Sequence, residues 1–137
     1  MRFSVKRAFV GGLLIVATGG AFAQASGLTR TVVGKADVSV PGREAVVARV
    51  DVAAGGMAGW HSHPGDEISY VLEGEVTLLM AGQAPRKVVA GESFVVPGGT
   101  VHNAMNSTAT PVKLVGVYVV EKGKPLAAPA ADPTAAK

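Results

Sequence analysis

Three histidines and one glutamate are the residues of this chain best suited to bind a metal ion. His61, His63 and Glu67 lie within seven positions in the segment WHSHPGDE, and His102 lies downstream in VPGGTVHNAMN. Three imidazoles and one carboxylate suit one divalent transition metal, whether iron, manganese, nickel, copper or zinc. On an octahedral ion, four such ligands leave two positions for water, substrate or dioxygen. The chain has no cysteine, so neither thiolate ligands nor disulfide bonds are available to it.

Strands are the elements that must bring these side chains together. Successive side chains of a strand point to opposite faces, so His61 and His63, two positions apart, face the same way. Residues 64–66, with the sequence Pro-Gly-Asp, predict a tight turn. Such a turn would place Glu67 at the head of the next strand, opposite the two histidines. His102 follows a second Gly-rich turn and would complete the cluster from a neighbouring strand of a closed sheet.

The rest of the sequence predicts an all-β fold. In EAVVARVDVA (44–53), Val46, Ala48, Val50 and Val52 alternate with polar residues and are expected to share one buried face. Further short, β-branched segments are separated by Gly-containing or polar turns. The predicted strands cover residues 29–35, 44–53, 68–72, 75–80, 86–90, 93–97 and 112–120. Many short strands with regular turn signals favour a sandwich or barrel.

The first 23 residues have the layout of a secretory signal peptide. Three basic residues precede an apolar run, and the segment ends on the small-x-small site Ala21-Phe22-Ala23, with Ala25 offering a second cleavage site. The apolar run is shorter than the roughly 20 residues of a membrane span, which disfavours a permanent anchor. Removal of the segment leaves ten basic and ten acidic residues, so the mature chain is expected to be neutral, without a basic patch for nucleic acid.

The sequence therefore divides into four predicted parts. Residues 1–23 are the signal peptide, and residues 24–34 form an N-terminal leader or first strand. Residues 35–123 form the β-barrel domain. Residues 124–137 are rich in Ala and Pro and are predicted to be a flexible tail, because they have too few large apolar side chains to offset the entropy of ordering.

Two ordered blocks of residues resemble the two sequence motifs of the cupin superfamily. The first block consists of Gly55, His61, His63, Glu67 and Gly74, and the second of Gly91, Pro97, Gly99, His102 and Asn106. All ten fixed positions match, and the short spacing between the blocks is similar to that of small single-domain bacterial cupins. The resemblance covers about residues 35–120.

The resemblance implies a fold and a metal site. The fold would be a small antiparallel jelly-roll β-barrel, and the metal ligands would be His61, His63, Glu67 and His102. Asn106 is expected to support the strand after His102 rather than to bind metal. The resemblance also suggests a homodimer.

The leading functional hypothesis is a periplasmic or secreted, metal-dependent oxidoreductase of the dioxygenase type. Its substrate would be a small chelating enol, diketone or phenolic compound, and Glu67 would serve as a catalytic base as well as a ligand. Two alternatives stay open. One is a non-catalytic protein that binds a metal or small ligand in the periplasm, and the other is a non-redox metal-dependent lyase or isomerase.

Overall fold

The protein is an all-β structure, as the sequence predicts. The computed structural model describes residues 25–135, so the predicted signal peptide (1–23) lies outside the described residues. Within them it contains ten strands and no helix, and hence no helix long and apolar enough to cross a membrane. The strands are β1 (Ser26–Asp37), β2 (Arg43–Met57), β3 (His61–Ser62), β4 (Gly65–Glu73), β5 (Glu75–Met80), β6 (Arg86–Val89), β7 (Ser93–Val96), β8 (His102–Met105), β9 (Val112–Glu121) and β10 (Ala128–Pro129).

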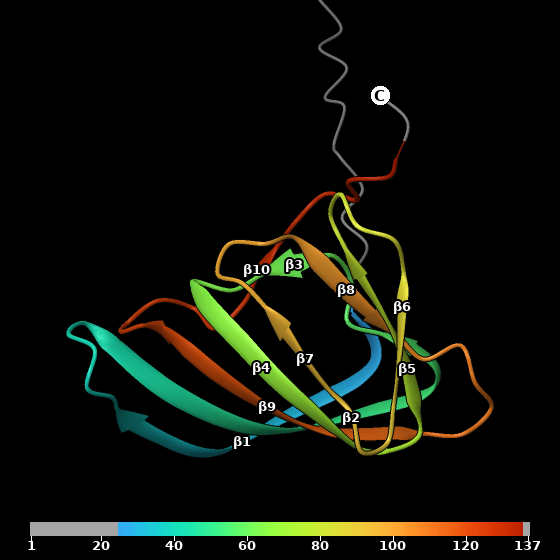
Figure 1. Cartoon of the computed structure of the whole chain (residues 1–137), viewed down its shortest axis with the longest axis horizontal. Coiled ribbons are helices and arrows are strands. Elements are labelled where there is room, and N and C mark those ends of the chain that lie inside the picture. Colours follow the sequence, from blue (N-terminus) through green and yellow to red (C-terminus); the bar gives the residue numbers. More distant parts are fainter. Residues whose placement is uncertain (1–24, 136–137) are drawn as a thin grey trace, which may run out of the picture.

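The strands form two antiparallel layers of a nearly closed barrel, consistent with the predicted jelly roll (Figure 1). The layer called here the large sheet has the order β1–β2–β9–β4–β7, and the layer called the small sheet has the order β10–β3–β8–β5–β6. The two sheets join where the end of β2 pairs with β8, at Met57 and Met105.

Alternating apolar residues fill the space between the sheets. The predicted alternation in β2 is confirmed, since Val46, Ala48, Val50 and Val52 are all buried while Arg49 is exposed. Burial of each valine contributes about 1.5 kcal/mol or more to folding, so this face of β2 holds the two layers together. The main core consists of Val50, Val52, Val71, Val76, Leu78, Val88, Phe94, Val96, Val112 and Leu114.

Strand pairing brings the candidate ligands to one end of this core. On the small sheet, β3 pairs with β8 so that His61 lies opposite His102. On the large sheet, β4 lies between β7 and β9, and Glu67 pairs with Val96 on one side and Tyr118 on the other. The histidines therefore come from the small sheet and its following loop, and the glutamate comes from the large sheet.

The tight turn predicted at residues 64–66 is wrong. Gly65 and Asp66 already belong to β4, and β3 and β4 are not paired with each other, because the chain passes here from one sheet to the other. Gly65 is required by close packing rather than by a reversal. A Cβ at this position would overlap the carbonyl oxygen of Val119 in β9, and Gly98 in the β7–β8 loop packs against the backbone of Gly65 itself.

Replacement of Gly65 by alanine is expected to lower the free energy of unfolding by about 2 kcal/mol, because backbone atoms of β9 must move to admit the new methyl group. Urea unfolding followed by circular dichroism would measure the loss. Gly34→Ala is the matched control, since the nearest atom to a Cβ there is 3.7 Å away and only ordinary contact results. Equal stability of the two variants would contradict the packing argument.

The Ala/Pro-rich segment that was expected to be flexible makes specific contacts with the barrel. Its strand β10 pairs with β3, and Leu126 packs against the buried residues Val46, Tyr118 and Val120. Trp60 accepts a backbone hydrogen bond from Ala130 through its carbonyl oxygen. These contacts place β10 beside β3, the strand that carries His61.

Candidate metal centre

All four predicted ligands meet at one point between the two sheets. His61 lies in β3, His63 in the loop that follows, Glu67 in β4 and His102 in β8. Their four ligand atoms lie within 4.8 Å of one another, and no side chain of the group is more than 7% exposed. The predicted convergence of these residues is therefore present in the structure.

Backbone carbonyls set the tautomer of each histidine. The Nδ1 atom of His61 lies 2.8 Å from the carbonyl oxygen of Gly59, and that of His102 lies 2.9 Å from the oxygen of Thr100. The Nδ1 atom of His63 lies 2.6 Å from the oxygen of Leu126. A carbonyl oxygen only accepts, so each Nδ1 carries a proton, and Nε2 is the ring nitrogen directed to the interior.

One carboxylate oxygen of Glu67 is held by a serine, and the other faces two imidazoles. Ser69 donates its hydroxyl to Oε1 at 2.7 Å. Oε2 lies 2.8 Å from Nε2 of His63 and 3.2 Å from Nε2 of His102. Burial alone raises the pKa of Glu67, but the contacts with His102, His63 and Ser69 outweigh it and hold the pKa below its usual range, so the group is an anion at neutral pH.

This arrangement fits a divalent metal ion. Within the described chain, Nε2 of His61 and Nε2 of His63 are buried without a hydrogen-bond partner, although the latter is close to Glu67. Neutral imidazole lone pairs that face a carboxylate repel it unless a proton or a metal ion lies between them. Donors about 2.1 Å from a shared ion lie roughly 3 Å apart when adjacent, which matches the distances from Glu67 to His63 and His102.

The cluster resists protonation at His61. Burial, and then the nearby His102, lower the pKa of His61 from 6.5 to about 4. A neutral imidazole is the form that binds metal, because the lone pair must be free. The environment therefore keeps this histidine ready to bind a metal throughout the physiological pH range.

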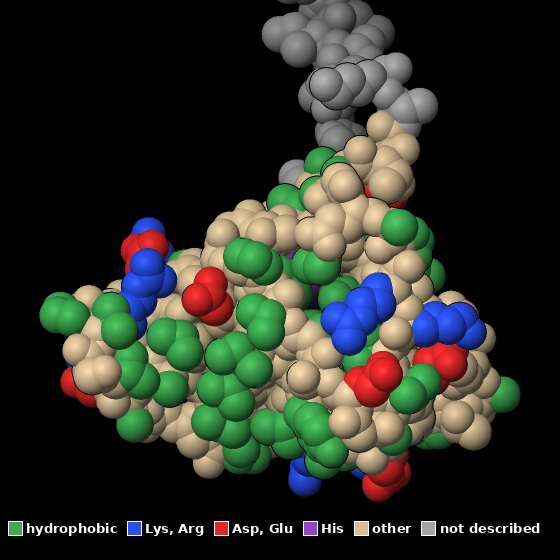
Figure 2. Space-filling model, viewed as in Figure 1, with side chains coloured by type: hydrophobic (Ala, Val, Ile, Leu, Met, Phe, Trp, Pro, Cys, Tyr) green, Lys and Arg blue, Asp and Glu red, His purple; other side chains and the backbone are tan. Residues whose placement is uncertain are grey.

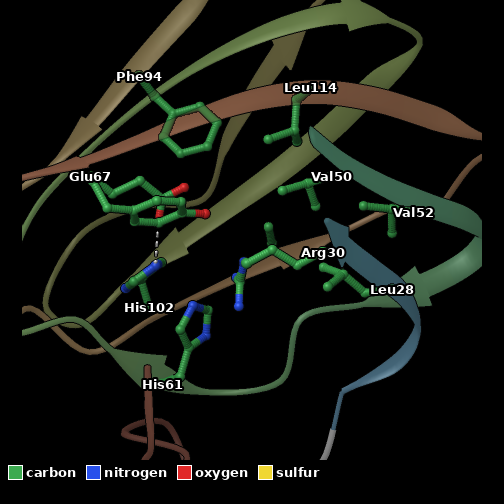
Figure 3. Close-up of a pocket in the computed structure, with 11 residues that line it drawn as sticks. Leu28, Arg30, Val50, Val52, His61, Glu67, Phe94, His102 and Leu114 are labelled. Atoms are coloured by element: carbon green, nitrogen blue, oxygen red, sulfur yellow. Dashed lines mark hydrogen bonds and ion pairs between the residues drawn. The ribbon is translucent and has the colours of Figure 1, made fainter. Parts of the chain in front are cut away.

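A small cavity adjoins three of the four residues, His61, Glu67 and His102 (Figure 3). Apolar side chains form most of its wall, namely Leu28, Val50, Val52, Phe94, Ala104 and Leu114. Its polar lining comes from His61, Glu67, His102, Tyr118 and Arg30. Burial and the charge of Glu67 raise the pKa of Tyr118 to about 12, against the opposing effect of Arg30, so the phenol keeps its proton.

Sequence reasoning missed three contributors to this site. Ser69 lies two positions after Glu67 on the same face of a strand, a spacing that could have identified it. Arg30 faces the cavity only because β1 pairs with β2, and the sequence does not show that register. The Leu126 carbonyl oxygen is a backbone atom of the predicted tail, and no side-chain pattern marks it.

Asn106 has the supporting role that was expected. Its amide nitrogen donates to the carbonyl oxygens of Val52, Ala53 and Thr110, and its oxygen accepts from the backbone N–H and hydroxyl of Thr108. The side chain thus fixes the loop after β8 to the end of β2. It does not belong to the group of four that could hold a metal ion.

Comparison with known proteins supports these features. The family described as "Cupin domain" matches residues 48–120. Among curated relatives, Germin-like protein 3-1 of Oryza sativa subsp. japonica is 43% identical over 82 residues, and Nectarin-1 of Nicotiana langsdorffii x Nicotiana sanderae is 34% identical over 77. Each alignment covers 53% of this chain but 36% and 34% of the relative, so the chain spans about a third of the length of these plant proteins.

Solved structures share the fold. A Klebsiella pneumoniae protein described as having a double-stranded β-helix domain has a TM-score of 0.63 at 24% identity, covering 77% of this chain and 85% of its own. The polyketide cyclase RemF from Streptomyces resistomycificus has a TM-score of 0.62 at 22% identity, covering 97% and 90%. At these identities the likeness shows the architecture alone.

Proposed function

The chain belongs to the cupin domain family, and on that premise we propose that it is a metal-dependent oxidoreductase of the dioxygenase type. The substrate is a small chelating compound with enol, ketone or phenol oxygens. The observation that supports the proposal is the convergence of three imidazole Nε2 atoms and one carboxylate beside a mostly apolar cavity.

His61, His63, Glu67 and His102 would hold one divalent iron, manganese, nickel, copper or zinc ion. When bound, such an ion acts as a Lewis acid that polarises substrate oxygens and, for a redox-active metal, supports reaction with dioxygen. The chain itself fixes the donor directions, because each imidazole is locked by a carbonyl oxygen and the carboxylate by Ser69.

Glu67 is the proposed proton acceptor. Its low pKa suits a permanent ligand better than a base, so this role requires Oε2 to leave its neighbours while Ser69 holds Oε1. Oε2 would then take the proton of the substrate enol or phenol. The apolar wall of the cavity excludes bulk water from that transfer.

Oxygen uptake tests the proposal. Mature protein loaded separately with iron, copper, nickel, manganese or zinc is incubated with a panel of small enols, diketones and phenols. Uptake with at least one redox-active metal and none with zinc is expected. Turnover with zinc alone, independent of oxygen, would indicate the non-redox lyase or isomerase. Ligand binding without turnover would indicate the non-catalytic binding protein.

Export to the periplasm or the medium is also proposed, because residues 1–23 have the composition of a signal peptide. The bacterial source suggested by the motif spacing is part of the same proposal. Mass spectrometry of protein from the exported fraction tests the export, and the expected result is an N-terminus directly after Ala23 or Ala25.

We further propose a homodimer formed through the outer face of the large sheet. Val47, Val117, Ile68 and Val95 lie opposite one another across β2, β9, β4 and β7 and form an apolar row. Tyr70 and Leu72, both 48% exposed, extend it along β4. Figure 2 shows hydrophobic side chains gathered on this face. A second copy can cover such a face by two-fold symmetry, because the patch is the same on both partners.

Ile68→Lys is expected to convert this dimer to a monomer, since Ile68 is in the middle of the apolar row and a buried lysine without a partner is unfavourable. Sedimentation equilibrium would measure the mass. Gln83→Lys, at an exposed position of the turn between β5 and β6 of the small sheet, is the matched control and is expected to remain dimeric. A wild-type monomer, or a dimer unaffected by Ile68→Lys, would rule out this interface.

A further inference from the structure

Arg30 places a guanidinium group beside the candidate metal ligands. It lies on β1, paired with Val50, and lines the same cavity as His61, Glu67 and His102. Figure 3 shows its side chain extending toward the two histidines. Arg30 is thus a cation at the wall of the site.

No anion of the described chain neutralises Arg30. Its Nε atom is buried without a hydrogen-bond partner among the described residues, and none of their ion pairs includes it. Glu67 is already shared between Ser69, His63 and His102. Among the described residues, the guanidinium contacts Tyr118, with the guanidinium carbon 5.6 Å from the ring centroid and a side-chain hydrogen bond between the two residues. A cation so placed favours an incoming anion.

The charge of the occupied site strengthens this preference. With a divalent ion bound, Glu67 leaves one net positive charge, and Arg30 brings the total to two. Apart from Tyr118 the remaining wall is apolar, so it supplies no opposing charge. Of the groups that a small organic substrate offers, a carboxylate arrives already ionised and accepts two parallel hydrogen bonds from a guanidinium.

The cavity also limits the size of the ligand. Its free volume is about 20 Å³, little more than the space that one water molecule needs. A large polycyclic phenol would require a much larger displacement of the walls than a short acid. The volume therefore favours a ligand of few carbon atoms.

From these observations we infer that Arg30 binds the carboxylate of a short-chain 2-oxo or enol acid at the metal centre. The inference rests on the proposed function and narrows its substrate class. The carboxylate pairs with the guanidinium, and the keto or enol oxygen of the same molecule faces the four metal ligands. Tyr118 holds the guanidinium from its other side.

Binding of pyruvate and of its neutral isostere pyruvamide tests the inference. Calorimetric titration is performed on zinc-loaded and on metal-free full-length mature protein, with zinc content measured separately. Wild-type protein is expected to bind pyruvate more tightly than pyruvamide. Arg30→Met is expected to weaken pyruvate binding by between about tenfold and 100-fold, as for loss of hydrogen bonds to a charged group, and to leave pyruvamide binding unchanged.

Two further variants sharpen the test. Arg30→Lys keeps the charge but loses the two-pronged geometry, so an intermediate pyruvate affinity is expected. Arg49→Met removes an exposed arginine of β2 and is expected to match wild type. If Arg30→Met does not fold, Arg30→Lys decides, because a weakened preference for pyruvate supports the role and an unchanged preference overturns it.

Failure of the inference is distinct from failure of the proposed function. Equal affinities for pyruvate and pyruvamide, no binding of either, or full pyruvate binding by Arg30→Met would overturn the role of Arg30. A zinc content near zero would instead count against the metal site, and the carboxylate preference would still be measured on the metal-free protein.

Discussion

Replacement of His63 by alanine is expected to lower the affinity for a divalent metal by about 100-fold or more. Loss of a group that merely orients a ligand costs 10- to 100-fold, and here the donor atom itself is removed. A 100-fold loss corresponds to about 2.7 kcal/mol. Because bound metal stabilises the folded state, the increase in Tm caused by saturating metal should fall by roughly 10 °C.

Elemental analysis after dialysis and thermal unfolding with and without metal would measure the two effects together. Ser62→Ala is the matched control, since Ser62 is the half-buried neighbour that lies outside the cluster of four. Its metal content and melting temperature are expected to match those of wild type. Unchanged metal occupancy in His63→Ala would show that His63 is not a ligand.

Acidification of the metal-free protein from pH 6.5 to pH 4 is expected to remove about 3 kcal/mol from the free energy of unfolding through His61 alone. Burial lowers the pKa of this imidazole from 6.5 to about 4. Between those values the unfolded chain binds a proton that the folded chain excludes, so stability falls as the pH falls. Each pKa unit corresponds to about 1.4 kcal/mol.

The variant His61→Gln isolates this effect, because glutamine does not titrate. Urea unfolding of both chelator-treated proteins at pH 7 and pH 4 should show a pH-dependent loss that is smaller by about 3 kcal/mol in the variant. Glu67 affects the free energy of unfolding in a different pH range. Its folded pKa lies below the usual range, so its contribution is present above pH 4.5 and is lost only under stronger acid. Identical pH dependence of the two proteins would contradict the prediction for His61.

The ligand cluster was predictable in part from local spacing. The two-residue spacing of His61 and His63 predicted that they face the same way, although only His61 lies in a strand and His63 lies in the loop that follows it, and a turn rich in glycine precedes His102. The sequence also predicted the core alternation of β2, since a strand buried on one face must repeat every second residue. The glycine at position 74, with a φ of 84°, joins β4 to β5 as a turn residue that other side chains rarely replace.

The remaining features depend on contacts between distant segments. The segment Pro-Gly-Asp has turn composition, yet Gly65 lies within β4 because β9 passes too close for any side chain there. Arg30 faces the cavity because the register of β1 on β2 sets it opposite Val50, and the sequence does not show that register. The composition of a segment predicts whether it favours a strand or a turn. The strand position of Gly65 and the orientation of Arg30 are determined instead by which strands become neighbours.

The hydrogen bond from His63 to the carbonyl oxygen of Leu126 has a consequence for how this protein can evolve. Every residue type has a carbonyl, so the segment after β9 can accumulate substitutions while continuing to fix the orientation of His63. At position 126 the packing against Tyr118 and its neighbours requires an apolar side chain. The hydrogen bond to His63 requires in addition that the segment between β9 and position 126 keep its length. Among diverged homologues, a shortened or lengthened tail would therefore mark an altered metal centre more reliably than any single substitution within the tail.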